Sequence, residues 1–439
     1  MKDPLVRQRD GWAFKTPAGS RFLRDPELFA VYSTSGNQWR KLMYFWEDWQ
    51  DLNLLVSMYD VYRSDTSLIR EMYRLGLRGH MAALRQRVGR RVLSKRLPQY
   101  AAYHQYIRLE KPFAHQGLLM LDSGGFSFGE PKKLHPLLKS PLPSIQRFAR
   151  LMLAISELES QAERWNARQF IRMARAAQRY HLRAQLRLKP DIVITLDRVM
   201  HYELPYWMKL RRLSFNLACA RTALELFVQT PEPRPLLFPV IHPAGPAWSE
   251  IGKEISPTAA EEHYTRTFTL QFAYLLRLEK RVGIRFGGFA VGSLVPVRNP
   301  AFLRLLARAV WRAVTACGVD GRPLHAFGAS DNKMLLLSRY GFTSFDSSLH
   351  IVKARNRQIY DPDTGNYKKL QPPARCQCPV CSRHSADELL ENRPGVKEVA
   401  TVLQSLHNFY ANHRVHLETL RRSKKSGKRV VPAPLQSDT

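Results

Sequence analysis

Seven short apolar runs alternate along the chain with longer segments in which apolar residues recur every three or four positions. Each run has the length of a buried strand and ends in small or acidic residues, which are typical of a following loop. The runs cover residues 54–57, 118–125, 191–197, 236–242, 284–292, 324–330 and 342–348, and the clearest helical segments cover 210–227, 263–281 and 300–317. This alternation predicts β/α units around a parallel sheet.

The number of these units favours a closed barrel. We expect an eighth strand in the N-terminal region, because about eight β/α units in 439 residues fit a (β/α)8 TIM-type barrel better than two doubly wound domains. An open α/β sheet is the alternative fold. In a barrel of this type, functional groups lie where the strands end and the βα-loops begin.

Three aspartates stand at such strand ends. Asp122 ends the run LLMLD, Asp197 ends DIVITLD, and Asp346 ends FTSFD. A single aspartate in this place more often caps a helix or forms a salt bridge. Three of them, with Gly124 and Gly125 beside the first, favour a site at the barrel mouth that is built from carboxylates.

A separate group of residues offers metal ligands. Cys376, Cys378 and Cys381 are three of only five cysteines, and His407 follows in a helical pattern that can pack over the cysteine loop. Three thiolates and one imidazole form a full tetrahedral set, which predicts a closed, structural Zn²⁺ site. His384 is the competing fourth ligand, and three ordinary reduced cysteines are the alternative without a metal.

The charge of the chain indicates a polyanionic partner. The formal net charge is +31, from 68 Lys and Arg against 37 Asp and Glu, while 44% hydrophobic residues are normal for a folded protein with a large core. No apolar stretch approaches the roughly 18 residues that span a bilayer, and the N-terminus MKDPLVRQRD lacks the apolar core of a signal peptide. We therefore expect a cytoplasmic protein that binds nucleic acid, with a membrane surface as the competing partner.

Several basic residues recur at helical spacing. One set predicts a stripe of guanidinium groups that can follow phosphates, although a solvated surface balanced by nearby glutamates is the competing interpretation. A second basic segment covers residues 70–96, and a basic tail begins at residue 421. The stripe consists of Arg168, Arg172, Arg175, Arg179 and Arg183.

The order of the motifs resembles one superfamily. DSGGF at 122–126, GGFAVG at 287–292, FDS at 345–347 and the cysteine–histidine set follow one another as in the tRNA-guanine transglycosylases, over about residues 54–421. Members of that superfamily exchange guanine in a polynucleotide for a 7-deazaguanine base. HAFGAS followed by FDSSLHIVKARNRQIYD is more similar to the archaeal-type and DNA-modifying branches than to the bacterial queuine-pathway enzymes.

The resemblance implies roles for the three aspartates. Asp346 would be the nucleophile that traps the sugar, and Asp122 would be the general acid/base that serves the leaving and incoming bases. Asp197 would accept hydrogen bonds from the N–H edge of a guanine-like ring. Further expected base contacts are Ser123, Gly124, Gly125, Phe126, His242, Gly287, Gly288 and Phe289, and expected nucleic-acid contacts are the arginine stripe with Lys353 and Arg355. For Phe126, Phe289 and Tyr59, core packing is the alternative to stacking on a base.

The chain departs from the superfamily's pattern in three places. Ser127 stands where Gln is common, His242-Pro243-Ala244 replaces Gln-Gly-Gly, and Ser293 replaces a frequent Glu. Loss of an acidic group near the 7-substituent of the incoming base disfavours a cationic aminomethyl group and is compatible with the neutral nitrile of preQ0.

The expected polymer is DNA. NLLVSMYDVYR at 53–63 resembles the DNA 7-deazaguanine transglycosylases of bacterial and phage DNA-modification systems, and the chain stops soon after His407, without a recognisable C-terminal RNA-binding domain. The resemblance further implies partner proteins of a modification system. An archaeal-type exchange on tRNA is the first alternative, and a noncatalytic nucleic-acid-binding subunit is the second.

The chain is expected to divide into four parts. A basic N-terminal region with the first barrel elements covers 1–110, and the barrel core, with a long Arg-rich helix near 145–189, covers 111–370. A zinc-binding subdomain with a closing helix covers 371–420, and a basic disordered tail covers 421–439.

Overall fold

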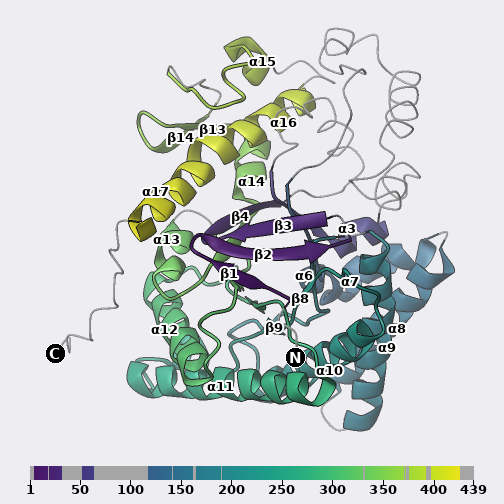
Figure 1. The fold of residues 1–439 in the computed structure, drawn as a ribbon. Helices are drawn as coiled ribbons and strands as arrows, with labels where there is room; N and C mark the ends of the chain where they lie inside the picture. Colours follow the sequence, from purple (N-terminus) through teal and green to yellow (C-terminus); the bar gives the residue numbers. More distant parts are fainter. Residues whose placement is uncertain are drawn as a thin grey trace.

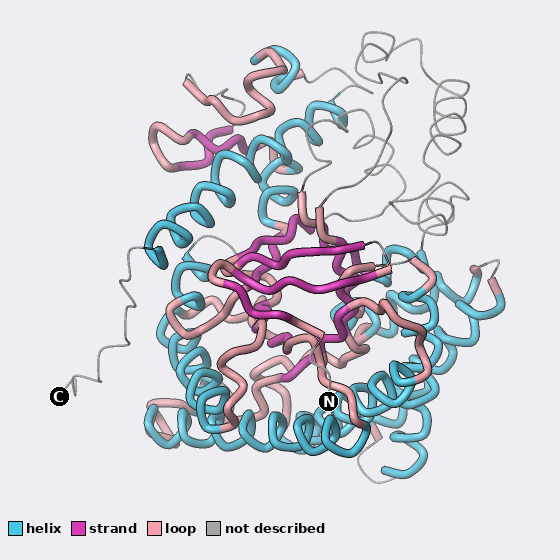
Figure 2. Tube along the Cα trace, viewed as in Figure 1, coloured by secondary structure: helices cyan, strands magenta, loops and turns pink. Residues whose placement is uncertain are grey.

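Helices surround a central sheet of parallel strands (Figures 1 and 2). The computed structural model describes residues 4–17, 19–31, 52–63, 117–140, 142–161, 165–188, 190–329, 332–369, 371, 375–391 and 397–425. The basic segment 70–96 that the sequence singles out lies outside these residues.

The central sheet closes into a barrel. Its order is β8-β7-β6-β5-β4-β12-β11-β10-β9, so β8 (Leu236–Phe238) and β9 (Val240–Ile241) are its two ends. These two strands are consecutive in the chain, and only Pro239, which lacks an N–H group for the ladder, separates them. Together they act as one strand that pairs with β7 on one side and with β10 on the other. The predicted TIM-type barrel is confirmed, and the alternative of an open sheet is wrong.

The other barrel strands lie where the apolar runs predict them. They are β5 (Leu54–Ser57), β6 (Leu119–Asp122), β7 (Ile192–Ile194), β10 (Phe289–Val291), β11 (Leu324–Ala326) and β12 (Ser344–Ser347). The expected N-terminal strand is β4 (Glu27–Val31), which is buried at its first four positions and pairs in parallel with β5 and β12.

Helices follow the strands along the chain. After the early barrel strands come α3 (Met58–Arg63), α6 (Gly125–Phe128), α7 (Pro131–Leu134) and a 3-10 helix (His135–Lys139). The later ones are α10 (Tyr206–Val228), a 3-10 turn (Trp248–Glu250), α11 (Pro257–Val282), α12 (Pro300–Ala316), α13 (Asn332–Ser338) and α14 (Leu349–Arg355).

Two helices, α8 (Pro143–Ser160) and α9 (Ala167–Leu186), occupy the region near 145–189. The Arg-rich helix expected in this region corresponds to α9, and α8 precedes it as a separate helix. The break comes before Asn166, whose side chain caps the second helix by accepting a hydrogen bond from the Gln169 N–H group at 2.9 Å.

A small antiparallel sheet covers one end of the barrel (Figure 1). It consists of β1 (Val6–Gln8), β2 (Gly11–Thr16) and β3 (Gly19–Arg24), and its buried Trp12 packs in the same apolar cluster as Phe238 from the barrel interior. Asp191, just before β7, accepts a hydrogen bond from Thr16 at 3.0 Å and pairs with Arg21 at 3.1 Å. The sheet therefore closes the end at which the barrel strands begin.

The C-terminal region returns to the first barrel strand. It contains β13 (Gln358–Asp361), β14 (Asn366–Lys369), α15 (Ala386–Leu390), α16 (Lys397–Asn408), a π-helical turn (Phe409–His413) and α17 (Arg414–Lys425). Arg421 donates to the Pro26 carbonyl at 3.1 Å and pairs with Glu27 at 2.9 Å. The expectation that a disordered tail begins at 421 is wrong, because α17 continues to Lys425; residues 426–439 lie outside the described part.

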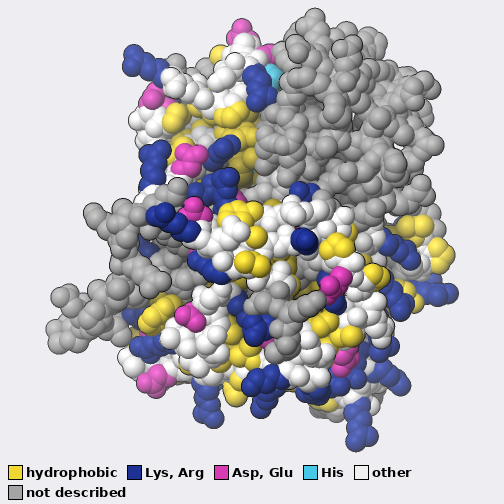
Figure 3. Space-filling model, in the orientation of Figure 1, with side chains coloured by type: hydrophobic (Ala, Val, Ile, Leu, Met, Phe, Trp, Pro, Cys, Tyr) yellow, Lys and Arg dark blue, Asp and Glu magenta, His cyan; other side chains and the backbone are white. Residues whose placement is uncertain are grey.

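Basic side chains are scattered over the face of the molecule shown in Figure 3, with fewer acidic ones between them. Among the described helices, none combines the length and the apolar character needed to cross a bilayer.

Candidate active site

The three aspartates from the strand ends meet at the barrel end opposite the small sheet. Asp122 is the last residue of β6, Asp346 lies in the last half of β12, and Asp197 follows β7. Parallel strands bring their C-terminal ends to the same side of a barrel. The structure therefore brings all three carboxyl groups together, close enough for the charges of Asp197 and Asp346 to act on Asp122.

Asp122 can change its protonation state near neutral pH. Burial, and then the negative charges of Asp197 and Asp346, raise its pKa to about 7, although backbone N–H groups of Gly124 and Ser123 act in the opposite direction. Its side chain is nevertheless partly exposed, so a ligand can reach it. A carboxyl group with such a pKa suits both the donation and the acceptance of a proton.

Asp346 is held through one of its two oxygens. Its Oδ1 accepts a hydrogen bond from the Gly328 N–H group at 3.0 Å and lies 3.2 Å from Nε2 of His325. The other ring nitrogen, Nδ1, lies 3.1 Å from the Ser344 hydroxyl, which can donate to it and so leave the ring proton on Nε2. Among the described contacts, both hydrogen bonds of this carboxylate go to Oδ1 and none goes to Oδ2.

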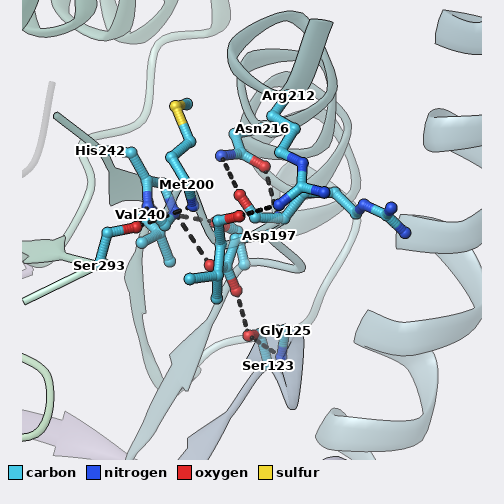
Figure 4. A network of polar contacts seen from close by, with 12 residues as sticks. Ser123, Gly125, Asp197, Met200, Arg212, Asn216, Val240, His242 and Ser293 are labelled. Atoms are coloured by element: carbon cyan, nitrogen blue, oxygen red, sulfur yellow. Dashed lines mark hydrogen bonds and ion pairs between the residues drawn. The ribbon is translucent and has the colours of Figure 1, made fainter. Parts of the chain in front are cut away.

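Asp197 is held through both oxygens (Figure 4). On one side, Oδ1 accepts a short hydrogen bond from the Ser123 hydroxyl, which in turn accepts one from the Gly125 N–H group at 2.9 Å. On the other side, Oδ2 lies 2.9 Å from Nε2 of His242. Asp197 therefore has a polar partner at each oxygen and keeps further lone pairs for the donors of a ligand.

The ring of His242 is fixed by Ser293. The Ser293 hydroxyl oxygen accepts a hydrogen bond from the Met200 N–H group at 2.8 Å and lies 2.8 Å from Nδ1 of His242. Because that oxygen already accepts from Met200, its own proton can go to Nδ1, which leaves the ring proton on Nε2 facing Asp197. Ser293 adopts a φ of 65°, uncommon for a residue with a side chain and often found at functional sites.

The backbone of His242 is also clamped. Gln271 accepts from its N–H group at 3.1 Å and donates to its carbonyl at 2.8 Å. Gly292 leaves room for the ring, since a Cβ there would lie 2.3 Å from it. His242 is fully buried with both ring nitrogens engaged. The ring therefore supports Asp197, and a contact of His242 with a base stays a prediction.

The predicted metal ligands also come together. Nδ1 of His407 lies 3.8, 3.4 and 3.2 Å from the sulfurs of Cys376, Cys378 and Cys381, and all four ligand atoms lie within 4.8 Å of one another. A tetrahedral zinc with bonds of about 2.0 Å to nitrogen and 2.3 Å to sulfur has S···N edges of roughly 3.5 Å, so the set can hold such an ion. His384 is outside this set and faces Glu388 at 3.8 Å.

The orientation of His407 supports the same conclusion. Its Nε2 lies 2.7 Å from the Tyr360 carbonyl and donates to it, which leaves the Nδ1 lone pair directed at the thiolates. Metal-binding histidines are commonly oriented by such a carbonyl. Asn408, the next residue, accepts from the Tyr360 N–H group at 2.8 Å and thereby fixes α16 against β13.

A family model described as Queuine tRNA-ribosyltransferase matches residues 270–428. This part of the chain is therefore similar to the tRNA-guanine transglycosylase superfamily. The matched residues include Asp346 and the four metal ligands, whereas Asp122 and Asp197 precede them.

Archaeal members of the superfamily are similar in part. The chain is 31% identical to the tRNA-guanine(15) transglycosylase of Haloferax volcanii over 29% of this chain and 24% of that protein. It is 30% identical to the tRNA-guanine(15) transglycosylase of Methanopyrus kandleri over 38% of this chain and 37% of that protein. It is 35% identical to the tRNA-guanine(15) transglycosylase of Methanosarcina mazei over 33% of this chain and 28% of that protein. The matches thus span between about a quarter and two fifths of the length of these relatives.

Not every predicted base contact lies near the three aspartates. Gly287 and Gly288 come before β10 and so lie nearer the strand starts, below the aspartates. A Cβ on them would lie 2.7 Å from Leu236 and 2.6 Å from Phe238, so packing already explains both glycines. Phe289 is buried against Phe272, with ring centroids 5.0 Å apart. Base contacts by these three residues are not supported.

Glycines of the DSGGF motif do lie at the site. Gly124 has a φ of 71°, and a Cβ on Gly125 would lie 2.1 Å from the Asp197 carboxylate. The Phe126 side chain is outside the described part. Tyr59 is a core residue, because it donates to the Lys133 carbonyl at 3.1 Å and packs against Phe128 with a centroid distance of 5.7 Å.

The arginine stripe lies on the outer face of α9. Four of its members are exposed, and Arg175 is partly buried. Glu159, one of the glutamates near the stripe in the sequence, forms a buried pair with Arg198 at 2.5 Å. On α14, directly after β12, Arg355 is exposed and Lys353 lies 4.8 Å from the Tyr367 ring centroid.

Sequence reasoning missed His325, Ser344 and the partnership of His242 with Ser293. The available signal was a histidine in the middle of the short apolar strand LHA, since a polar side chain buried in a strand requires a partner. Its partner is supplied by the adjacent strand, where His325 pairs in register with Ser344.

Proposed function

We propose that this chain replaces guanine in a polynucleotide by a 7-deazaguanine base, through a covalent glycosyl intermediate on Asp346. The observation that carries the proposal is that two neighbouring carboxyl groups have different environments. Asp122 has a pKa raised to about 7, while Asp346 accepts two hydrogen bonds on one oxygen and keeps the other for attack. Replacement of a group at a sugar's anomeric carbon with retained configuration requires such a pair.

Each half of the exchange uses both carboxyl groups. First, Oδ2 of Asp346 forms a bond to C1′ as the bond from C1′ to the base breaks, and Asp122 gives its proton to the departing guanine. Asp122 then takes a proton from the incoming base, whose nitrogen forms the new bond to C1′ as the bond to Asp346 breaks. Atoms and protons balance over the cycle without any further reactant.

Recognition of the base falls to Asp197. The Watson–Crick edge of guanine offers two neighbouring N–H donors, and an acceptor-only carboxylate matches them. Ser123 and His242 already hydrogen-bond to the Asp197 carboxylate, and they fix its plane before a base binds. Adenine lacks this donor pair, so the arrangement favours guanine-like rings.

Replacement of His242 tests this support. His242→Leu removes the donor to Asp197, and loss of one partner of a buried polar group costs about 1–3 kcal/mol, so the KM for free guanine should rise roughly 5- to 100-fold while kcat changes less. His242→Gln can place an amide N–H near the position of Nε2 and should recover most of the loss. Guanine-exchange kinetics will measure both variants. A Leu variant with the wild-type KM, or a Gln variant as impaired as Leu, would contradict the assigned role.

The relatives favour tRNA as the polymer, since the archaeal proteins reported above are named tRNA-guanine(15) transglycosylases. DNA is the second candidate, supported by the resemblance of 53–63 to the DNA-modifying branch. For the incoming base, Ser293 in place of a frequent Glu supports neutral preQ0 over a cationic base.

Mass spectrometry of nucleosides from tRNA and from DNA, each incubated with the protein and preQ0, tests polymer and base together. A 7-cyano-7-deazaguanine nucleoside in one polymer identifies the substrate. Incorporation from the aminomethyl base in preference to preQ0 would contradict the choice of base, and absence of any exchange in both polymers, with guanine as well as preQ0, would contradict the activity.

Zinc would be held by Cys376, Cys378, Cys381 and His407, and it would link the cysteine loop to α16 and β13. Its removal by a chelator should lower the melting temperature by on the order of 10 °C, because ligand binding to the folded state stabilises that state. Elemental analysis should find one zinc per chain in the wild type and less in Cys378→Ser. Cys317→Ser is the matched control that should keep its zinc; zinc-free protein with an unchanged melting temperature would contradict the site.

A further inference from the structure

Three exposed aromatic rings follow Asp197 along the chain. His201 is exposed, Tyr206 is 48% exposed and Trp207 is 40% exposed, and all three belong to the loop and helix that follow Asp197. Because α10 follows the loop from β7, its N-terminus lies at the barrel end that holds the aspartates. We name His201, Tyr206 and Trp207 the aromatic rim.

Neighbouring side chains hold the first two rings in place. His201 stacks on Tyr202 with a centroid distance of 4.4 Å and an interplanar angle of 27°. Tyr206 meets His263 edge to face at 5.8 Å. The rim is therefore supported from the protein side while large parts of its rings are open to solvent.

Trp207 is supported by a cation. The guanidinium carbon of Arg211 lies 4.4 Å from the Trp207 ring centroid and 4.3 Å from that of Trp165. Arg211 is itself fixed, since it donates to the carbonyls of Glu159 and Gln161 at 2.8 and 2.9 Å. A ring held in this way loses little conformational freedom when a further flat group stacks on it.

The surroundings favour a nucleic acid as the occupant. Trp165 lies just before α9, so the rim adjoins the end of α9 where the arginine stripe begins with the exposed Arg168. The acidic residue Glu203 lies between His201 and Tyr206 in the sequence, and its carboxylate accepts a hydrogen bond from Ser249 at 2.8 Å. Exposed aromatic faces beside cations, on a chain of net charge +31, match the bases and phosphates of a single strand.

We propose that the aromatic rim stacks unpaired bases that flank the target guanine. The inference rests on the proposed exchange reaction, in which the target nucleotide has to leave its stack for C1′ to reach Asp346. Nucleotides next to it lose stacking partners at that moment, and Tyr206 and Trp207 replace those partners at the mouth of the barrel.

Alanine substitution at the rim tests the inference. Stacking of a base on an aromatic ring contributes about 1–3 kcal/mol, so Trp207→Ala should weaken the binding of labelled single-stranded DNA and RNA oligonucleotides roughly 5- to 100-fold, whereas Trp207→Phe should retain most of it. The affinity for free guanine should not change. Trp311→Ala is the matched control, because Trp311 is 39% exposed but lies towards the far end of α12.

Each result has a defined consequence. Wild-type affinity of Trp207→Ala for both oligonucleotides would overturn the inference and leave the rim as a surface for a protein partner. An equal loss in Trp311→Ala would also overturn it. If the wild-type protein exchanges no guanine, the proposed activity fails, but the comparison of oligonucleotide affinities still decides whether the rim binds single strands.

Discussion

Asp346→Asn is expected to abolish guanine exchange, with a loss of at least about 10³-fold, while polynucleotide binding stays close to that of the wild type. The amide keeps the size of the side chain but provides no anionic oxygen to bond with C1′. The covalent complex between protein and polynucleotide, visible on a denaturing gel for the wild type, should disappear. Exchange and binding are measured on the same preparation, so loss of folding can be told from loss of the nucleophile.

Asp320→Asn is the matched control for this experiment. Asp320 is exposed in the turn before β11, at the barrel end that the small sheet covers, and its replacement should leave exchange unchanged. An Asp346→Asn protein that still exchanges guanine at a substantial fraction of the wild-type rate would refute the covalent mechanism. A wild-type protein that binds polynucleotides tightly without any exchange would favour the noncatalytic alternative.

The second large effect concerns Asp122 and pH. The carboxyl group has a pKa raised to about 7, so it carries the proton for guanine departure below that pH and loses it above. The single-turnover rate of covalent-complex formation should therefore fall as the pH rises through about 7. In Asp122→Asn the rate should be about 10²- to 10⁴-fold lower and should no longer show this fall.

This prediction separates a proton donor from a structural residue. A variant that is slower but keeps the wild-type fall in rate above pH 7 would show that another group supplies the proton. Single-turnover rates measured across the neutral range, with substrate in excess of its dissociation constant, give the profile directly.

Much of the barrel could be predicted because buried parallel strands appear as short continuous apolar runs. The N-terminal sheet was not predicted, since β1 is exposed at all three positions and β3 is buried at only one, so neither has the apolar pattern of a core strand. The strand break at Pro239 was also invisible, because one apolar run covers both β8 and β9.

Site residues could be predicted from the sequence only where their place at the end of a strand brings them to the site. Asp122 and Asp346 end apolar runs, and parallel strands bring such ends together. The pairing of His325 with Asp346 depends instead on the register between β11 and β12, which no spacing along the chain reveals. The position of the GGF segment near the start of β10 could not be predicted for a related reason: a motif identifies a strand but not which end of it faces the ligand.

In the part of the chain that the structure describes, the small sheet covers the barrel end at which the strands begin, and the three aspartates lie at the opposite end. Under the proposed exchange, the released guanine leaves through the same end of the barrel by which the incoming base enters. The bound polymer covers part of that end during both steps. The sugar stays covalently bound to Asp346 between these two steps. Guanine should therefore be released before the incoming base binds. Accumulated guanine should inhibit the reaction, because it competes with the incoming base for the same binding site.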